Sequence, residues 1–185
     1  MEKVLVSACL LGAPVRYHGG DAACSHLILR QWMEAGRLIA VCPEQEGGLP
    51  TPRPPAEIVP GPLDHRSQPS HPISNAAGGR AVIAGSAVVR TIRGDDVTPQ
   101  FCRGAGRALE LVEQHGIRTA VLKEGSPSCA SASLYDGTFS GTRVAGVGVT
   151  TALLEAHGVR VFNETQIESA QQWLDQLERL HSSPS

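Results

Sequence analysis

Three short apolar segments of this chain each run into a loop that carries a cysteine. The segments are residues 4–6, 38–41 and 119–122. The cysteines that follow them are Cys9, Cys42 and Cys129. Because stretches with helical periodicity separate the segments, they are expected to be parallel strands of one sheet. Ligands bind beyond the carboxyl ends of the strands in such sheets, so the three thiols are predicted to converge on one site.

The remaining elements extend this α/β pattern along the chain. Helices are expected near residues 26–35, 98–116, 149–156 and 165–180. A fourth core strand is expected at 160–163, and residues 81–84 and 87–91 have the composition of a hairpin or a pair of short strands. We predict one α/β domain over residues 1–185, with a mostly parallel sheet flanked by helices in a Rossmann-like three-layer arrangement and a small hairpin insertion.

Two segments have the composition of loops. Four of the six residues from 50 to 55 are proline, which removes backbone donors and fixes φ. Residues 47–56 are therefore predicted to be a stiff irregular loop behind Cys42. Residues 60–79 are rich in proline, serine, histidine and glycine, and they are predicted to be a long flexible loop and a candidate lid.

The overall charge limits the classes of partner. The 185-residue chain has 16 basic and 18 acidic residues and a formal net charge of −2. This balance gives no basic footprint for nucleic acid or an anionic membrane, so a small-molecule partner is expected. The first residues lack the pattern of a secretory signal, and no run approaches the ~20 apolar residues that span a bilayer. A cytoplasmic location is expected.

The chain has five cysteines, and an odd number in a reducing compartment favours metal ligands, nucleophiles or core residues over a disulfide framework. From spacing alone, three scattered cysteines are a weak metal signal, and buried structural thiols are an equally good interpretation. Glycine, proline, serine and charged neighbours favour a site at Cys9, Cys42 and Cys129. Cys24 and Cys102 lack such a setting and are interpreted as incidental.

Three thiolates without a fourth protein ligand suit a metal centre with one open position. Zinc would hold water in that position and generate hydroxide near neutral pH. A four-iron cluster would leave one iron free to take a substrate atom. The residues alone leave both kinds of metal centre open.

Side chains next to these cysteines are candidates for acid–base chemistry. Glu44 stands two positions after Cys42, so on an extended segment it would point to the same side as the thiol and could act as a general base. Ser126 stands three positions before Cys129, where its hydroxyl could face an anion or a developing oxyanion. A solvated loop glutamate and a turn serine are the simpler interpretations.

Other charged residues and one glycine motif carry weaker signals. Lys123 follows the strand at 119–122 and is a candidate to pair with Glu124, to anchor the site or to bind substrate. Ion pairs that only fix loops are the interpretation for Glu46, Arg53 and Glu57. Residues 146–151 resemble a dinucleotide fingerprint but lack its third glycine and a preceding strand, so no dinucleotide cofactor is expected.

Seven stretches of the sequence together resemble one family. They are residues 7–12, 41–44, 47–58, 96–98, 123–129, 135–141 and 146–150. These long motifs, which lie between Lys3 and Asn163, resemble the bacterial thiouracil desulfidase-like family.

The resemblance implies an α/β enzyme that carries a [4Fe-4S] cluster on Cys9, Cys42 and Cys129. The iron without a protein ligand would bind the sulfur of a thiocarbonyl, as in 2-thiouracil or 4-thiouracil. Water would replace that sulfur, which gives uracil and sulfide without net redox change. By the same matching, Glu44 resembles the family's acid–base residue and Ser126 its active-site serine.

Some features leave substrate and function open. His18 stands where an acidic or amide residue is common in the family, and residues 60–79 have a composition of their own. A sulfur-relay or tRNA-modifying protein could use the same cluster, but it would be expected to show a basic surface or an adenylation loop. A non-enzymatic binding domain with a structural zinc would need a fourth protein ligand near the thiols. The natural substrate and the oligomeric state are left open.

Overall fold

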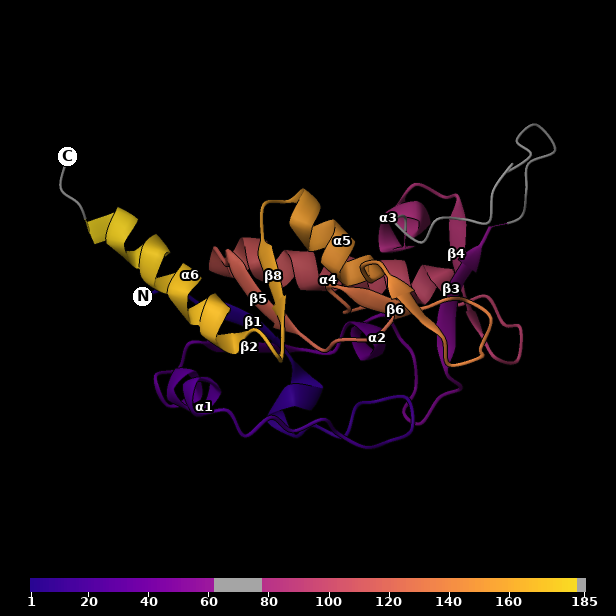
Figure 1. The fold of residues 1–185 in the computed structure, drawn as a ribbon, viewed down its shortest axis with the longest axis horizontal. Helices are drawn as coiled ribbons and strands as arrows, with labels where there is room; N and C mark the ends of the chain where they lie inside the picture. Colours follow the sequence, from indigo (N-terminus) through magenta and orange to yellow (C-terminus); the bar gives the residue numbers. More distant parts are fainter. Residues whose placement is uncertain (62–77, 183–185) are drawn as a thin grey trace.

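The central sheet has four parallel strands within residues 1–61 and 78–182, which are the residues that the computed structural model describes (Figure 1). Its strand order is β2-β1-β5-β8. The strands are β1 (Val4–Ser7), β2 (Leu38–Val41), β5 (Thr119–Leu122) and β8 (Arg160–Asn163). The two inner strands, β1 and β5, are buried along their whole length because helices cover both faces of the sheet.

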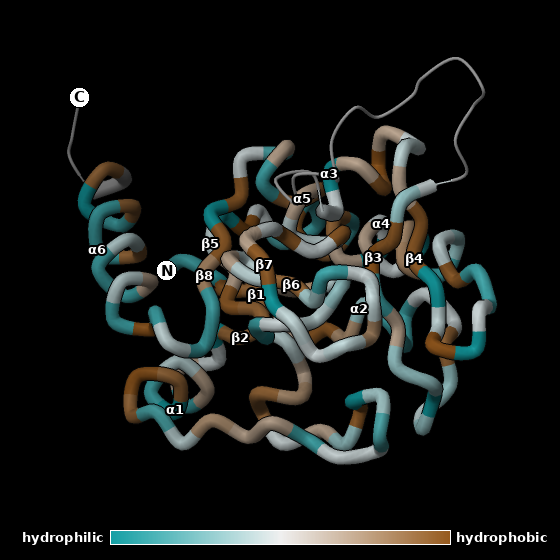
Figure 2. Tube along the Cα trace, turned by 45° about the vertical axis from the view of Figure 1, so that its right-hand side comes forward, coloured by the Kyte–Doolittle hydropathy of each residue, from teal (hydrophilic) through white to brown (hydrophobic). Residues whose placement is uncertain are grey.

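Two pairs of helices form the outer layers. Helices α1 (Leu27–Glu34) and α6 (Ile167–Ser182) cover one face, and α4 (Thr98–His115) and α5 (Val149–Ala156) cover the other. Successive side chains of β1 point to opposite faces: Val4 and Val6 pack in the core with α1 and α6, and Leu5 packs in the core with α4 and α5. Figure 2 shows hydrophobic residues along the inner strands and a mixture of hydrophobic and polar residues on the outer helix α6.

Smaller elements surround the carboxyl end of this sheet. A one-turn helix, η1 (Ala8–Leu11), follows β1, and the short helix α2 (Pro43–Glu46) follows β2. Strands β3 (Ala56–Pro60) and β4 (Ala87–Thr91) form an antiparallel pair, with helix α3 (Gly78–Ile83) between them in sequence. Strands β6 (Ser133–Tyr135) and β7 (Arg143–Ala145) form a second antiparallel pair between β5 and α5. Both pairs lie beyond the main sheet toward one end of the molecule (Figure 1).

The predicted α/β class, the parallel core strands and the four main helices are confirmed. The hairpin predicted from residues 81–84 and 87–91 is wrong. Residues 81–83 belong to helix α3, which ends with Ser86 N–H donating to the Ala81 carbonyl, and Gly85 closes this helix instead of a hairpin. A short apolar run does not distinguish a buried helix turn from a strand. Residues 87–91 do form a strand, but its partner is β3.

The loop predicted at residues 60–79 falls mostly outside the described residues. Its ends are described, because Pro60 closes β3 and Gly78 begins α3, whereas residues 62–77 are outside them. The interpretation of this segment as a lid therefore stays a prediction. Within the described part of the chain, no helix has the length and apolar character needed to cross a membrane.

A close contact between helices α4 and α2 fixes the start of the segment that follows Cys42. A Cβ on Gly104 of α4 would lie 1.8 Å from the Pro43 carbonyl oxygen, and a Cβ on Gly47 would lie 2.0 Å from the Gln100 carbonyl oxygen. The two backbones can approach this closely only because both positions are glycine. The position of α2, and of the residues that it carries, therefore depends on Gly104.

The Gly104→Ala variant is expected to lower the free energy of unfolding by about 1–3 kcal/mol, because the added methyl group must push α2 away from α4. The matched control is Gly106→Ala on the same helix, where a Cβ would meet nothing within 4 Å. That control is expected to raise the free energy of unfolding by about 0.5–1 kcal/mol, since alanine favours the helix. Urea unfolding of both variants measures the two effects. An unchanged stability for Gly104→Ala would contradict the close contact.

Candidate active site

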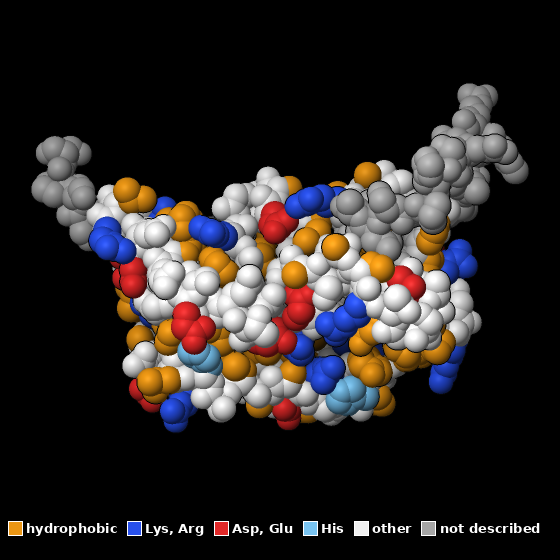
Figure 3. Space-filling model, in the orientation of Figure 1, with side chains coloured by type: hydrophobic (Ala, Val, Ile, Leu, Met, Phe, Trp, Pro, Cys, Tyr) orange, Lys and Arg blue, Asp and Glu red, His pale blue; other side chains and the backbone are white. Residues whose placement is uncertain are grey.

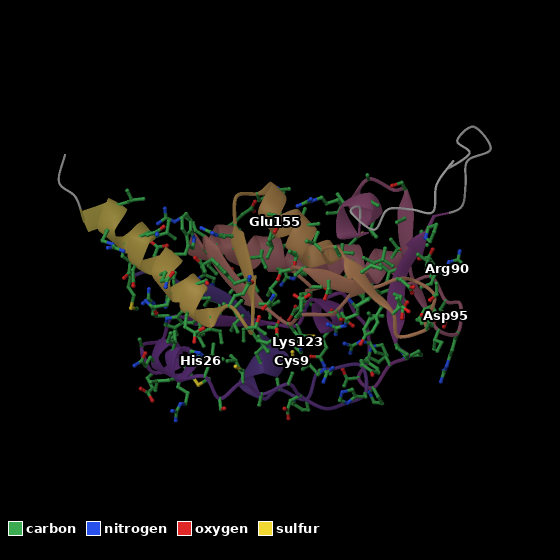
Figure 4. The ribbon with its side chains drawn as sticks, viewed as in Figure 1. Cys9, His26, Arg90, Asp95, Lys123 and Glu155 are labelled. Carbon is green, nitrogen blue, oxygen red and sulfur yellow. The ribbon has the colours of Figure 1, made fainter. Side chains whose placement is uncertain are left out.

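A cavity of about 350 Å³ opens beyond the carboxyl ends of β1, β2 and β5. Cys9, Cys42 and Cys129 all line it. Cys9 is on η1 directly after β1, Cys42 directly follows β2, and Cys129 lies in the loop after β5. Figure 4 shows Cys9 next to Lys123 at this end of the sheet. Three thiols that are far apart in sequence therefore share one wall, as expected for the carboxyl edge of a parallel sheet.

The three thiols are free and at least partly buried. Cys9 and Cys129 are buried, and Cys42 is half-buried. Burial raises the pKa of Cys9 to about 11, and the neighbouring Cys42 adds to the shift. Burial likewise raises the pKa of Cys42. It also raises the pKa of Cys129, and the Glu44 charge beside Cys129 adds to that shift. Burial outweighs the nearby Lys123 and Arg16 at Cys9 and the nearby Arg53 at Cys42, so these groups are uncharged thiols at neutral pH. A bound metal would favour their thiolate forms.

The three thiols lie close enough to influence one another. A negative charge on Cys9 or Cys42 raises the pKa of Cys129. The side chains as placed do not form a ready site for one ion, because no three histidine, cysteine, aspartate or glutamate residues within 1–61 and 78–182 form a group that could hold a metal ion. By donor chemistry, three soft thiolates suit an iron–sulfur cluster.

The other two cysteines lie away from this cavity wall. Cys102 is exposed on α4, and Cys24 is half-buried in the segment before α1. Neither residue lines the cavity. The three cavity thiols thus have no fourth cysteine partner within the described residues.

Glu44 is held in the cavity wall by two donors. The Arg53 Nε–H donates to Glu44 Oε2 at 2.8 Å, and the Ser126 hydroxyl donates to Glu44 Oε1 at 3.1 Å. The ion pair is buried, because the Arg53 and Glu44 side chains are 6% and 15% exposed. Each carboxylate oxygen therefore has one fixed protein partner and a lone pair left for another donor.

The expectation that Glu44 lies on an extended segment is wrong. Cys42 is the N-cap residue of α2, and Glu44 is in the first turn of that helix. Pro43 at the start of α2 has no N–H group that would be left unpaired, and its ring fixes φ at a helical value. The helix therefore begins directly after Cys42. Cys42 and Glu44 nevertheless line the same cavity.

Ser126 connects Glu44 to the loop that carries Cys129. Its Oγ accepts hydrogen bonds from the backbone N–H groups of Ser128 at 3.1 Å and Cys129 at 3.3 Å. These bonds fix the side chain, so its hydroxyl proton is directed at Glu44. The local turn that is the simpler interpretation of Ser126 is present, and the same side chain also reaches the cavity.

Lys123 lies in the cavity wall and pairs with Glu164, which follows β8. The Lys123 ammonium also donates to the Glu124 carbonyl at 3.2 Å. Glu164 Oε2 accepts the Glu124 N–H at 2.8 Å, so this residue ties the ends of β5 and β8 together. An ammonium has three donors, and these two contacts leave one of them for a ligand in the cavity.

The Glu124 carboxylate organises the loop that contains Ser126 and Cys129. It accepts the backbone N–H and hydroxyl groups of Ser131 and Ser133 at 2.7–3.1 Å, and the Asn163 side-chain amide at 3.2 Å. Burial alone would raise the pKa of Glu124, but the hydrogen bonds from Ser131 and Ser133 outweigh it and hold the pKa below its ordinary value of 4.5.

The Glu124→Gln variant is expected to be less stable than wild type at neutral pH, because an amide NH₂ cannot accept these N–H donors. The folded-state pKa of Glu124 is lowered, so its stabilisation is complete above pH 4.5 and is lost as the pH falls through the folded-state pKa. The stability difference between variant and wild type should shrink over that acidic range in a urea-unfolding series. The exposed Glu113→Gln is the control, with no expected difference. A difference that is independent of pH would contradict the role of the charge.

The outer wall of the cavity contains residues for which no role was predicted, although Tyr135 and Phe139 lie in the stretch 135–141 that resembles the family. Tyr135, Phe139 and Arg143 come from the hairpin formed by β6 and β7, and Ile92 follows β4. The charged residues on the wall are of both signs, and they are Arg16, Glu44, Arg53, Glu57, Lys123, Glu124 and Arg143. Figure 3 shows basic and acidic side chains side by side near the middle of one face, bordered by hydrophobic patches. The cavity can therefore contact a ligand with both apolar surface and polar groups.

The roles of Glu164 and Arg53 were not predicted, and the sequence indicates the first more clearly than the second. Glu164 follows β8 as Cys9 follows β1, so the rule that identified the cysteines also applies to it. Arg53 was expected in a loop-fixing ion pair, and nothing in the proline-rich loop indicates that its partner is Glu44. Glu46, which was expected in a similar pair, lies 4.0 Å from Arg107 and does not line the cavity.

Comparisons with known proteins add an independent line of evidence. The model of the 2-thiouracil desulfurase family matches residues 4–166. Uncharacterized protein YbbK of Bacillus subtilis (strain 168) is 38% identical over 164 residues, which cover 89% of this chain and 97% of the relative. The solved structure of the [4Fe-4S]-dependent thiouracil desulfidase TudS matches with a TM-score of 0.78 at 45% identity. That match covers 95% of this chain and 99% of the solved chain.

Proposed function

Because this chain belongs to the 2-thiouracil desulfurase family, we propose that it is a [4Fe-4S]-dependent desulfidase. Its substrates are thiolated pyrimidine bases such as 2-thiouracil and 4-thiouracil, and its products are the oxo base and sulfide. The main support for the proposal is that three free thiols converge on one cavity. Next to them lies Glu44, which is held by Arg53 and Ser126. The TudS similarity, over nearly the whole of both chains, supports the same activity.

Cys9, Cys42 and Cys129 would hold the cluster. Soft thiolates suit iron–sulfur clusters, and three of them leave one iron without a protein ligand. The similarity to TudS, which is a [4Fe-4S]-dependent enzyme and 45% identical, favours a cluster over one zinc ion. When bound, the cluster would supply a Lewis acid that takes the thiocarbonyl sulfur.

Glu44 would act on the water that replaces the sulfur. Arg53 holds one carboxylate oxygen and Ser126 the other, so the carboxylate has a fixed orientation toward the cavity. A carboxylate in this position can accept a proton from water as the oxygen adds to the thiocarbonyl carbon. In the net reaction one water adds, the C=S bond becomes C=O, and the sulfur leaves as sulfide with both water protons.

Ser126 and Lys123 would orient the reactants. Ser126 is a positioning residue for Glu44, because its hydroxyl donates to the carboxylate and its oxygen is fixed by two backbone N–H groups. Lys123 would direct its remaining donor at a ring oxygen or nitrogen of the base. Glu164 fixes the ammonium and so limits where this donor can point.

In this proposal the protein binds a small base as its substrate and is located in the cytoplasm. A cavity of about 350 Å³ has the size of a small-molecule site. The net charge of −2 does not favour nucleic acid as the substrate. All five cysteines are free, which suits a reducing compartment.

Product stoichiometry tests the proposed reaction. The protein is loaded with iron and sulfide under anaerobic conditions and given 2-thiouracil in water enriched in ¹⁸O. One sulfide per uracil, with ¹⁸O in the uracil carbonyl and no reductant consumed, is the expected result. Sulfur transferred to a second molecule instead of released, or turnover that needs a reductant, would overturn the hydrolytic desulfidase and favour a sulfur relay.

A further inference from the structure

Phe139 in the β6–β7 hairpin has a strained backbone at the wall of the cavity. Its φ is 57°, and among the described residues it is the one non-glycine residue with a positive φ. A bulky residue rarely adopts this left-handed conformation, because its Cβ crowds the backbone. Phe139 is half-buried and lines the cavity. Strain of this kind persists only where the surrounding structure imposes it.

A buried carboxylate, Glu57 of β3, holds the backbone of Phe139. Glu57 is buried, at 7% exposure, and its Oε2 accepts the Phe139 N–H at 3.0 Å. Glu57 also lines the cavity. The neighbouring Gly137 lies against the same strand, since a Cβ there would be 2.6 Å from the Ile58 carbonyl oxygen. The tip of the hairpin is therefore fastened to β3 on the side of the cavity away from the main sheet.

The residues with proposed roles in the reaction do not require Phe139 to adopt this backbone conformation. Glu44, Ser126 and Lys123 are held by Arg53, by backbone N–H groups and by Glu164, and none of them contacts Phe139 in any hydrogen bond or ion pair. A glycine at residue 139 would relieve the strain at once. Glycine would lack the aromatic ring that Phe139 places in the wall of the cavity. In the proposed function this cavity binds a planar base.

We propose that Phe139 packs against the pyrimidine ring of the substrate and that Glu57 is a positioning residue that holds Phe139 in place. This inference rests on the proposed function and extends it to recognition of the ring. Aromatic side chains stack on any base, since every base has a π face. Phe139 would thus contribute to binding of the substrate and its product equally and would have little effect on the chemical step.

The test compares Phe139→Asn with Phe139→Tyr in cluster-loaded protein. Asparagine tolerates the left-handed conformation but has no ring, whereas tyrosine keeps the ring. Phe139→Asn is expected to raise the Kd for uracil, measured by anaerobic calorimetry, and the KM for 2-thiouracil by about tenfold. Its kcat should stay within about threefold of wild type, as for a loss of uniform binding. Phe139→Tyr should restore both constants. An unchanged Kd in Phe139→Asn would overturn the proposal.

A further variant separates recognition from folding. Phe139→Gly suits the backbone better than phenylalanine does, so it should unfold at an equal or higher temperature than wild type while binding uracil about tenfold more weakly. Weak binding together with a lowered unfolding temperature would mean that Phe139 only supports the fold.

The role of Glu57 is tested by a double-mutant cycle on the uracil Kd. Glu57→Ala should weaken binding in wild type but have no added effect in Phe139→Asn, because it acts through Phe139. Glu57→Gln keeps an acceptor oxygen and should bind like wild type. An equal loss in both backgrounds would mean that Glu57 contacts the base itself, and the positioning role would be wrong.

The same data distinguish failure of this inference from failure of the proposed function. Wild type that binds uracil but releases no sulfide would end the desulfidase proposal and leave the Kd comparison valid. Wild type that releases sulfide, with Phe139→Asn unchanged in Kd and KM, would end only the stacking proposal. Wild type that binds neither uracil nor 2-thiouracil would overturn both.

Discussion

The Cys42→Ser variant is expected to lose the cluster and to lower 2-thiouracil turnover by about a thousandfold or more. Cys42 is a half-buried N-cap residue, so serine fits the position and the fold should be retained. A hydroxyl is a poor ligand for iron–sulfur clusters, which require soft thiolates. Loss of a Lewis acid removes several kcal/mol of transition-state stabilisation, and each 1.36 kcal/mol is tenfold in rate. Iron per chain and sulfide release measure both effects.

The matched control is Cys102→Ser. Cys102 is exposed on α4 and does not line the cavity, so this variant should keep wild-type iron content and turnover. The same loss of iron and turnover is expected for serine at Cys9 and at Cys129, although these thiols are buried and their variants must first be shown to fold by circular dichroism. Full iron content in Cys42→Ser, or loss of iron in Cys102→Ser, would contradict the assignment of the three ligands.

The second large effect is expected for Glu44→Gln, which should lower kcat by about 10²–10³-fold without loss of iron. Glutamine has nearly the same shape and keeps one acceptor for Arg53, but it cannot take a proton from water. The change also leaves the buried Arg53 cation without its counter-charge, so the unfolding temperature should fall. Comparison of kcat, iron content and unfolding temperature separates the catalytic effect from the structural one.

Glu46→Gln is the control for this experiment. Glu46 lies on the same short helix, two residues further along, and its side chain is 48% exposed. Removal of its charge should change neither turnover nor iron content. If Glu44→Gln kept wild-type kcat with an intact cluster, then Glu44 would not be the acid–base residue, and the carboxylate would have only its structural contacts with Arg53 and Ser126.

The elements of the fold that could be predicted are those that local sequence patterns indicate. The inner strands β1 and β5 are apolar runs buried on both faces, and α5 is predicted at its observed bounds because its apolar residues repeat with helical spacing. The carboxyl-end rule then brought three distant cysteines to one edge. Pairing of β3 with β4 could not be predicted in this way, because the two strands are separated by α3 and by residues outside the described structure.

The candidate site was predicted where its residues follow strands and missed where they depend on nonlocal contacts. Cys9, Cys42 and Lys123 directly or closely follow β1, β2 and β5. The pairing of Arg53 with Glu44 depends on how the proline-rich loop folds back over α2, which composition does not specify. Phe139, which has a positive φ, is held by Glu57 of β3, so no local pattern could indicate this contact.

The rate of 2-thiouracil conversion as a function of cluster occupancy, measured in one anaerobic preparation, tests whether the chain is a cluster-dependent desulfidase. We expect four irons per chain at full loading and a rate of sulfide release that rises in proportion to occupancy, with none from metal-free protein. Equal rates from metal-free or zinc-loaded protein, or full cluster loading without sulfide release, would contradict this activity.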